Sequence, residues 1–162
     1  MGFFDKVKGF FNVDGAKIEI NEVETPFPFT DSVHRGRFLV KAGGAVATVK
    51  DFTVTFVATI TKEDGQEVDV LLSEEEVGSE ANWSDPADNP IPKVVAKGAE
   101  YEIQFLLTRV DLVEALKEYG ITNAATARNY KTKFKIKVEV DIAEAVGLFD
   151  PTAERLVEVI DK

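Results

Sequence analysis

Residues 52–61 read FTVTFVATIT, and this stretch decides the fold class. Every second residue from Phe52 to Ile60 is apolar, and threonine fills the alternate positions except at Val57. Strict alternation over this length predicts a β-strand with one buried face and one face in water. Residues 131–142, KTKFKIKVEVDI, repeat the pattern with lysines and acids on the polar side. The two stretches together predict an antiparallel β-protein.

Shorter stretches with the same period of two extend the prediction to seven or eight strands. Turn residues separate them, such as the hairpin pair Asp64-Gly65, and Pro26 and Pro28, which cannot donate to a ladder. Because few helices accompany the strands, we expect an all-β fold, an antiparallel β-sandwich of the immunoglobulin-like kind. The other expected strands lie at residues 16–20, 38–42, 68–72, 94–95, 101–107 and 154–160.

Residues 3–11 predict a short amphipathic helix at the N-terminus, because apolar residues recur there at helical spacing. Burying each large apolar side chain is worth about 1.5–3 kcal/mol, so leaving them all in water is costly. Three roles stay open for this helix: packing on the sandwich, docking on a partner or a second copy, and weak contact with a membrane surface. Its candidate interaction residues are Phe3, Phe4, Val7, Phe10 and Phe11.

A second helix is predicted over residues 111–119, inserted between two strands of the sandwich. Asp111 can cap its N-terminus, and Gly120 follows its last residue, where glycine commonly ends a helix. A further helical turn is predicted at residues 123–129. The insertion adds helical structure to an otherwise all-β chain.

Residues 73–90 are polar and acidic and predict a long loop, a feature that in compact domains is often functional. The loop holds the only tryptophan, Trp83, either as an anchor packed on the sandwich or as an exposed interaction residue. Residues 85–89 offer oxygen ligands for calcium but lack the EF-hand spacing. We favour a solvated acidic loop and assign no metal ligand.

The residue composition excludes several kinds of catalytic site. The chain has no cysteine, which excludes disulfides, thiolate metal sites and cysteine nucleophiles. Its one histidine, His34, excludes metal sites built from several histidines, and a Ser-His-Asp triad would have to use it. We interpret His34 as a surface residue at a strand end. The sequence therefore predicts no catalytic, metal or cofactor-binding residues and a protein that is not an enzyme.

Chain length and net charge indicate the expected localisation and exclude one class of partner. The chain has 162 residues and a net charge of -10, so it repels phosphates, and we expect no nucleic-acid partner. No apolar run approaches the roughly 18 residues of a membrane span, and no signal-peptide core is present. We therefore expect one cytoplasmic domain over residues 1–162, with the helix in 1–12 and the sandwich in 13–162.

Four lysines alternate along one predicted strand. One interpretation is a wet sheet face with lysines that protect a sheet edge. The other is a functional surface that accepts an acidic partner or pairs with this chain's own acidic strands. The four are Lys131, Lys133, Lys135 and Lys137.

Several segments resemble the bacterial sporulation-control protein family. They are residues 2–8 (GFFDKVK), 35–44 (RGRFLVKAGG), 138–143 (VEVDIA) and 148–152 (LFDPT). The resemblance implies an arrestin-like β-sandwich that serves protein interaction and regulation and brings no catalytic residues. It also implies that the second domain of larger members is missing here.

Two functions follow from these patterns. We expect a non-catalytic regulatory module that binds a protein partner, by addition of a β-strand or by docking on a sheet face. The alternative is a structural or self-assembling protein, a homo-oligomer held together by edge strands or by the phenylalanine-rich helix.

Overall fold

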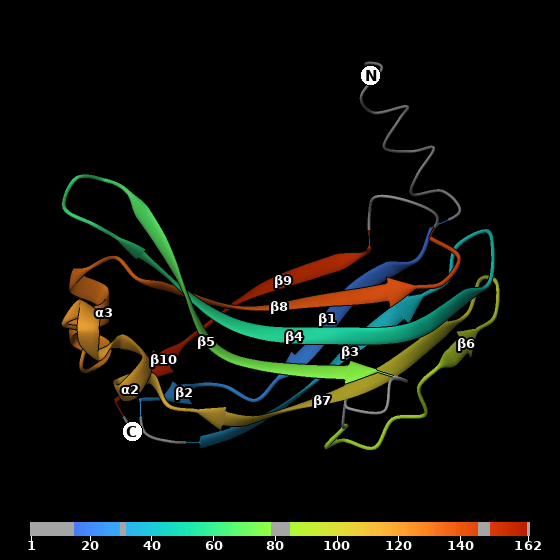
Figure 1. The fold of residues 1–162 in the computed structure, drawn as a ribbon, viewed down its shortest axis with the longest axis horizontal. Coiled ribbons are helices and arrows are strands. Elements are labelled where there is room, and N and C mark those ends of the chain that lie inside the picture. Colours follow the sequence, from blue (N-terminus) through green and yellow to red (C-terminus); the bar gives the residue numbers. More distant parts are fainter. Residues whose placement is uncertain (1–14, 30–31, 79–84, 146–149, 162) are drawn as a thin grey trace, which may run out of the picture.

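The computed structural model describes residues 15–29, 32–78, 85–145 and 150–161. In these residues the chain is mostly β-strand, and the two larger sheets are antiparallel (Figure 1). The predicted all-β class is confirmed. The smaller of these sheets has the order β1-β3-β7 and consists of β1 (Lys17–Val23), β3 (Ser32–Lys41) and β7 (Glu100–Val110).

The larger sheet has the order β5-β4-β8-β9, so β4 and β8 are its inner strands. A short strand, β6, pairs with the start of β4 on the side that β5 occupies further along. The hairpin of β4 and β5 projects at the end of the molecule where α3 lies (Figure 1). The strands are β4 (Ala47–Thr61), β5 (Glu67–Gly78), β6 (Lys93–Val95), β8 (Lys133–Ile142) and β9 (Thr152–Val157).

The predicted insertion between two strands is helical, as expected. Asp111 caps its start by accepting a hydrogen bond from the backbone N–H of Glu114 at 3.1 Å. Gly120 ends it in the left-handed region, at φ 75°. The segment comprises α2 (Leu112–Leu116), a 3₁₀ turn η1 (Lys117–Tyr119) and α3 (Ala124–Asn129).

The core lies between the apolar faces of the two larger sheets. Phe38 of β3 meets Phe52 of β4 edge to face, with ring centroids 5.3 Å apart. Phe27 packs on Phe56 at 4.4 Å, and Phe56 in turn lies near Phe134 of β8. Burial of each of these side chains stabilises the fold by about 1.5–3 kcal/mol. The alternation at residues 52–61 thus defines the buried side of the central strand, as predicted.

The predicted loop at residues 73–90 is wrong for its first third, because β5 continues through Gly78. The backbone of β5 pairs with β4 along this stretch, with Glu74 opposite Thr55 and Val77 opposite Phe52. The paired backbone overrides the low strand propensity of the acidic side chains.

The last predicted strand, 154–160, is two strands. After β9 the chain pairs again, as β10 (Val159–Ile160) beside β2 (Phe27–Pro28), and this pair is parallel. Pro28, expected to end a strand, lies within this short β2. Among the described residues no helix is both long and apolar enough to cross a membrane.

Candidate functional site

The sequence-predicted interaction residues stay a prediction, because none of them is among the described residues. The helix predicted for residues 3–11 and the tryptophan of the predicted acidic loop lie outside the described residues. The residues concerned are Phe3, Phe4, Val7, Phe10, Phe11 and Trp83. A candidate site has to be built from the surfaces that the structure describes.

The outer side of the larger sheet carries side chains sorted by charge, strand by strand. We call this surface the charged face. Its acidic row on β5 and its basic row on β8 lie on either side of a row of threonines on β4. The acidic row is Glu67, Asp69, Glu74 and Glu76; the threonine row is Thr53, Thr55, Thr59 and Thr61; the basic row is Lys133, Lys135 and Lys137.

Strand register fixes which charges share a level across this face. Thr59 of β4 has Asp69 on one side and Lys133 on the other. One level on, Val57 lies between Leu71 and Lys135. The level of Thr55 holds Glu74 and Lys137 in the same way.

Among the described residues the two charged rows form no ion pair with each other. Neighbouring strands are spaced by about 4.8 Å, so rows on either side of β4 are about 10 Å apart. Asp69 instead accepts a hydrogen bond from Thr59 Oγ1 at 2.7 Å. Lys135 pairs with Glu154 of β9 at 3.5 Å, while Lys133 and Lys137 form no ion pair with a described residue.

Because threonine is short and its flanking side chains are long, the charged face is hollowed over β4. The hollow has a volume of about 580 Å³. Leu156 on β9 is 67% exposed beside it, and Leu71 on β5 is 54% exposed. The hollow is lined by Thr59, Glu67, Asp69, Lys133, Lys135, Glu154 and Leu156.

One end of the charged face is acidic. Burial, together with the charge of neighbouring Glu76, raises the pKa of Glu74. Further along, Asp51 lies opposite Asp141 across β4 and β8, and burial and the Asp141 charge raise the pKa of Asp51. Acidic residues therefore crowd the end of the charged face beyond Lys137, where Glu76 and Glu139 flank Thr53 and Asp51 lies opposite Asp141.

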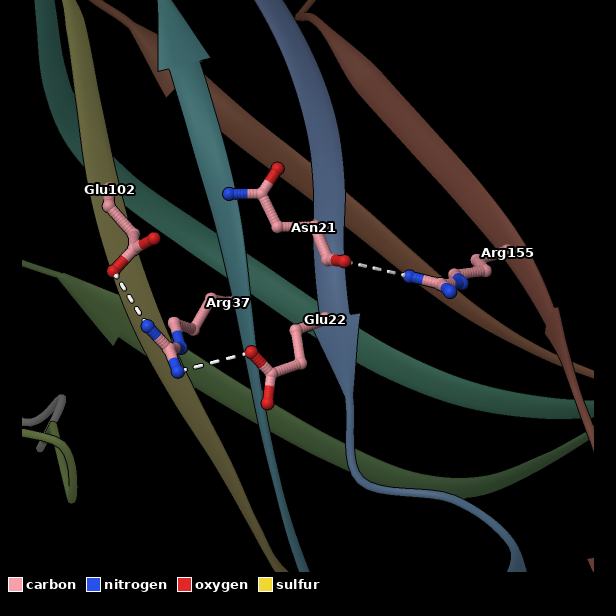
Figure 2. A network of polar contacts seen from close by, with 5 residues as sticks. All are labelled: Asn21, Glu22, Arg37, Glu102 and Arg155. Carbon is pink, nitrogen blue, oxygen red and sulfur yellow. Dashed lines mark hydrogen bonds and ion pairs between the residues drawn. The ribbon is translucent and has the colours of Figure 1, made fainter.

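The outer side of the smaller sheet carries a different polar network, shown in Figure 2. Arg37 of β3 lies between Glu22 of β1, at 3.1 Å, and Glu102 of β7, at 3.3 Å (Figure 2). These side chains are 45%, 60% and 41% exposed, so water and salt screen the pairs and each adds little to stability.

Side chains tie the two sheets together along both of their neighbouring edges. Arg155 of β9 donates hydrogen bonds to the backbone carbonyls of Ile20 and Asn21, at the bulge in β1. Figure 2 shows the bond to Asn21. On the opposite side, Thr108 of β7 donates to the carboxylate of Glu75 on β5, through both its backbone N–H and its hydroxyl. A strand added at either place would have to displace these contacts.

His34 is buried, so its assignment to the surface is wrong. It is only 6% exposed because its ring stacks on Phe27 with centroids 3.8 Å apart. Its Nε2 is 2.8 Å from Ser32 Oγ, and its Nδ1 is 3.1 Å from the backbone carbonyl of Glu24. Burial lowers the pKa of His34. The imidazole can accept the Ser32 proton, but a backbone carbonyl stands where a triad has its acid.

The turn at residues 85–89 uses its carboxylate for structure. Both oxygens of Asp85 accept hydrogen bonds, from the backbone N–H groups of Ala87 and Asn89 and from the Asn89 side chain. Asn89 also bonds the backbone of Gln104 on β7, which docks the turn on the smaller sheet. These are the roles of an Asx turn.

The basic row lies on a wet face, but the edge-protecting interpretation is wrong, because β8 is an inner strand with β4 and β9 on its two sides. The expected pairing with the chain's own acids occurs at Lys135. Sequence reasoning missed the hollow, because it depends on Thr59 lying between two charged strands. The alternation of residues 131–137 was the available signal.

Comparison with known proteins finds likeness in structure alone. The sporulation control protein Spo0M from Bacillus subtilis aligns with 90% of this chain at a TM-score of 0.60 and 16% identity. The alignment covers 49% of that protein, so this chain spans about half its length. A protein from Archaeoglobus fulgidus aligns with 89% of this chain and 98% of its own, at 15% identity and a TM-score of 0.49.

No protein-family model and no curated protein sequence matches the chain. At 16% identity the likeness to Spo0M shows a shared fold and nothing more.

Proposed function

We propose that this chain is a non-catalytic regulatory module that binds another protein and is built as an arrestin-like β-sandwich. The observation that carries the proposal is the likeness to Spo0M, a sporulation control protein, over 90% of this chain. The contact of Phe38 with Phe52 between the two sheets supports the sandwich arrangement. A regulatory role is what we carry over from that protein.

The charged face is the surface that we assign to the partner. The hydrogen bonds that Arg155 and Glu75 make between the two sheets disfavour addition of a strand at the neighbouring sheet edges. The charged face instead offers two exposed apolar side chains, Leu156 in the lining of the hollow and Leu71 on β5, beside two rows of charge. Such a mixture of apolar contact and complementary charge suits a protein partner.

A binding role, as opposed to catalysis, is favoured by the surroundings of His34. Its imidazole is packed against Phe27, and neither the hollow over β4 nor the one beside Tyr119 and Tyr130 includes it. Catalytic groups act on a substrate held in a concave pocket beside them. Ser32 and His34 therefore fit a structural hydrogen bond.

The test is capture of a partner by the whole chain and by two matched variants. Thr59→Arg fills the hollow from the middle of the larger sheet, and Leu39→Arg places the same side chain at the middle of the smaller sheet's outer side. We expect a partner from a bacterial lysate, purified and rebound, to bind the wild type and Leu39→Arg equally. Thr59→Arg should weaken its binding by about tenfold or more, equivalent to about 1.4 kcal/mol.

Two results would reject the proposal. Equal binding by Thr59→Arg and wild type would remove the charged face from the interaction. Failure to recover any saturable protein partner, in the presence of correctly folded chain, would contradict the binding function itself.

A further inference from the structure

The charged face holds charges that have no ionic partner in the part of the chain that the structure describes. Lys133 and Lys137 make no ion pair with a described residue, and neither do Asp69 and Glu74. They stand in two rows because every second residue of a strand points to the same side, and on β5 the bulge at Leu72 and Ser73 returns Glu74 to the side of Asp69. Any surface that covers this face must therefore present the opposite order of charges, basic over β5 and acidic over β8.

A second copy of the same face has this order when it is turned about a twofold axis that runs along β4. This rotation keeps each residue at its position along β4 and exchanges the β5 side of the sheet with the β8 side. It sets the basic row of the second copy over the acidic row of the first, and the reverse. Asp69 then faces Lys133 of the second copy, because both lie at the level of Thr59. Glu74 faces Lys137 for the same reason at Thr55.

The same rotation places apolar groups together at the centre. Val57 lies on the axis and faces its own copy, and Leu71 faces the aliphatic stem of Lys135. A twofold axis that runs across the strands would instead bring like charges together, because it sets the acidic row over the acidic row and the basic row over the basic row. Only the axis along β4 makes the charged face complementary to itself, as a symmetric interface requires.

The hollow fits this arrangement. The long acidic and basic side chains rise on either side of the short threonines, so the two copies touch first along the rows where their charges are opposite. At a net charge of -10 two copies repel each other at long range. The lysines of the charged face offset part of this repulsion at the levels of Thr59, Val57 and Thr55, whereas at the level of Thr53 the rotation sets Glu76 over Glu139 of the second copy.

We propose that a second copy of this chain binds the charged face, in a symmetric face-to-face dimer with its axis along β4. The inference rests on the proposed function in that it names an occupant for the same surface. A contact limited to these strands buries less than about 1,200 Å² in total, which is the size of weak interfaces. We therefore expect a dissociation constant on the order of 0.1–1 mM.

Two charge-reversed variants test the arrangement by sedimentation equilibrium, from about 10 µM to about 1 mM. The basic-row variant carries Lys133→Glu with Lys137→Glu, and the acidic-row variant carries Asp69→Lys with Glu74→Lys. Each variant sets like charges opposite each other in a homodimer, so each should associate at least about tenfold more weakly than wild type. An equimolar mixture of the two restores opposite charges in both rows and should associate within about threefold of wild type.

The acidic-row variant separates this proposal from simple charge repulsion. It makes the chain less negative overall, so long-range repulsion alone predicts tighter association, whereas the proposal predicts weaker association. Lys17→Glu, on β1 of the smaller sheet, is the control and should leave association unchanged. The mixture also reports on folding, because two misfolded variants could not restore each other.

Strictly monomeric wild type across the whole range would overturn the proposal. So would a mixture that stays monomeric, or a control that dissociates as the row variants do. None of these outcomes touches partner capture by wild type and its loss in Thr59→Arg, so the two claims fail separately.

Discussion

At Gly36 the backbone of β3 passes directly under an aromatic ring. A Cβ atom at this position would overlap the ring of Phe105 and lie 2.8 Å from the backbone oxygen of Glu22. The strand is flanked on both sides, so neither neighbour can move away freely. We predict that Gly36→Ala lowers the free energy of unfolding by about 1–3 kcal/mol, the usual cost of overpacking. Urea unfolding measures it.

The matching control removes the ring instead of changing the backbone. Phe105→Leu should destabilise alone, yet in the Gly36→Ala background it should cost less, because the clash is relieved. Additive effects of the two substitutions would contradict the contact as the cause.

His34 makes stability depend on pH near neutrality. Burial lowers its pKa below the ordinary value of about 6.5, so below that pH the unfolded chain binds more protons than the folded one. Stability from this residue is complete above about pH 6.5 and falls as the pH drops toward the lowered pKa.

We predict that His34→Gln removes this part of the pH dependence. Urea unfolding at about pH 7.5 and about pH 5.5 should show a larger loss on acidification in wild type than in the variant. An equal loss in both proteins would mean that the buried imidazole does not carry the effect.

At the scale of strands, β4 and β8 hold two like charges directly opposite each other. Asp51 faces Asp141, and burial and this neighbouring charge raise the pKa of Asp51. The folded chain therefore takes up a proton at a higher pH than the unfolded chain does. Stability from this pair rises as the pH falls through the raised pKa.

Asp51→Asn should accordingly stabilise the protein at neutral pH. Cross-strand pairs contribute about 0.2–1 kcal/mol, and we expect the low end because solvent screens partly exposed charges. Thermal unfolding of Asp51→Asn and of the control Glu118→Gln, an exposed acid of η1, measures the difference. A gain equal to that of the control would exclude the cross-strand repulsion.

Element type followed from periodicity where the pattern was uninterrupted. The strand at 52–61 and the cap at Asp111 could be predicted because alternation and capping are local properties. The end of β5 could not be predicted from such local properties. A bulge opposite Phe56 and Val57 leaves Leu72 and Ser73 buried in succession. That extra residue shifts the alternation by one position, and the glutamates that follow then read as a loop.

At the scale of the whole molecule, the charged face exists only through register. The acids of β5 and the lysines of β8 are some 60 residues apart in sequence, and nothing local indicates that β4 lies between them. The sequence shows the acidic row and the basic row separately, but it does not show that one strand separates them in the sheet. The burial of His34 has the same origin, because it depends on Phe27 arriving from another strand.

We propose above all that this chain binds protein through the charged face. The most direct measurement is the change in backbone amide chemical shifts of isotope-labelled chain when the captured and purified partner is added. We predict changes concentrated in β4, β5 and β8, around Thr59, Asp69 and Lys135, with little change around Arg37 and Leu39 on the smaller sheet. Changes confined to β1, β3 and β7, with the charged face unaltered, would contradict the account.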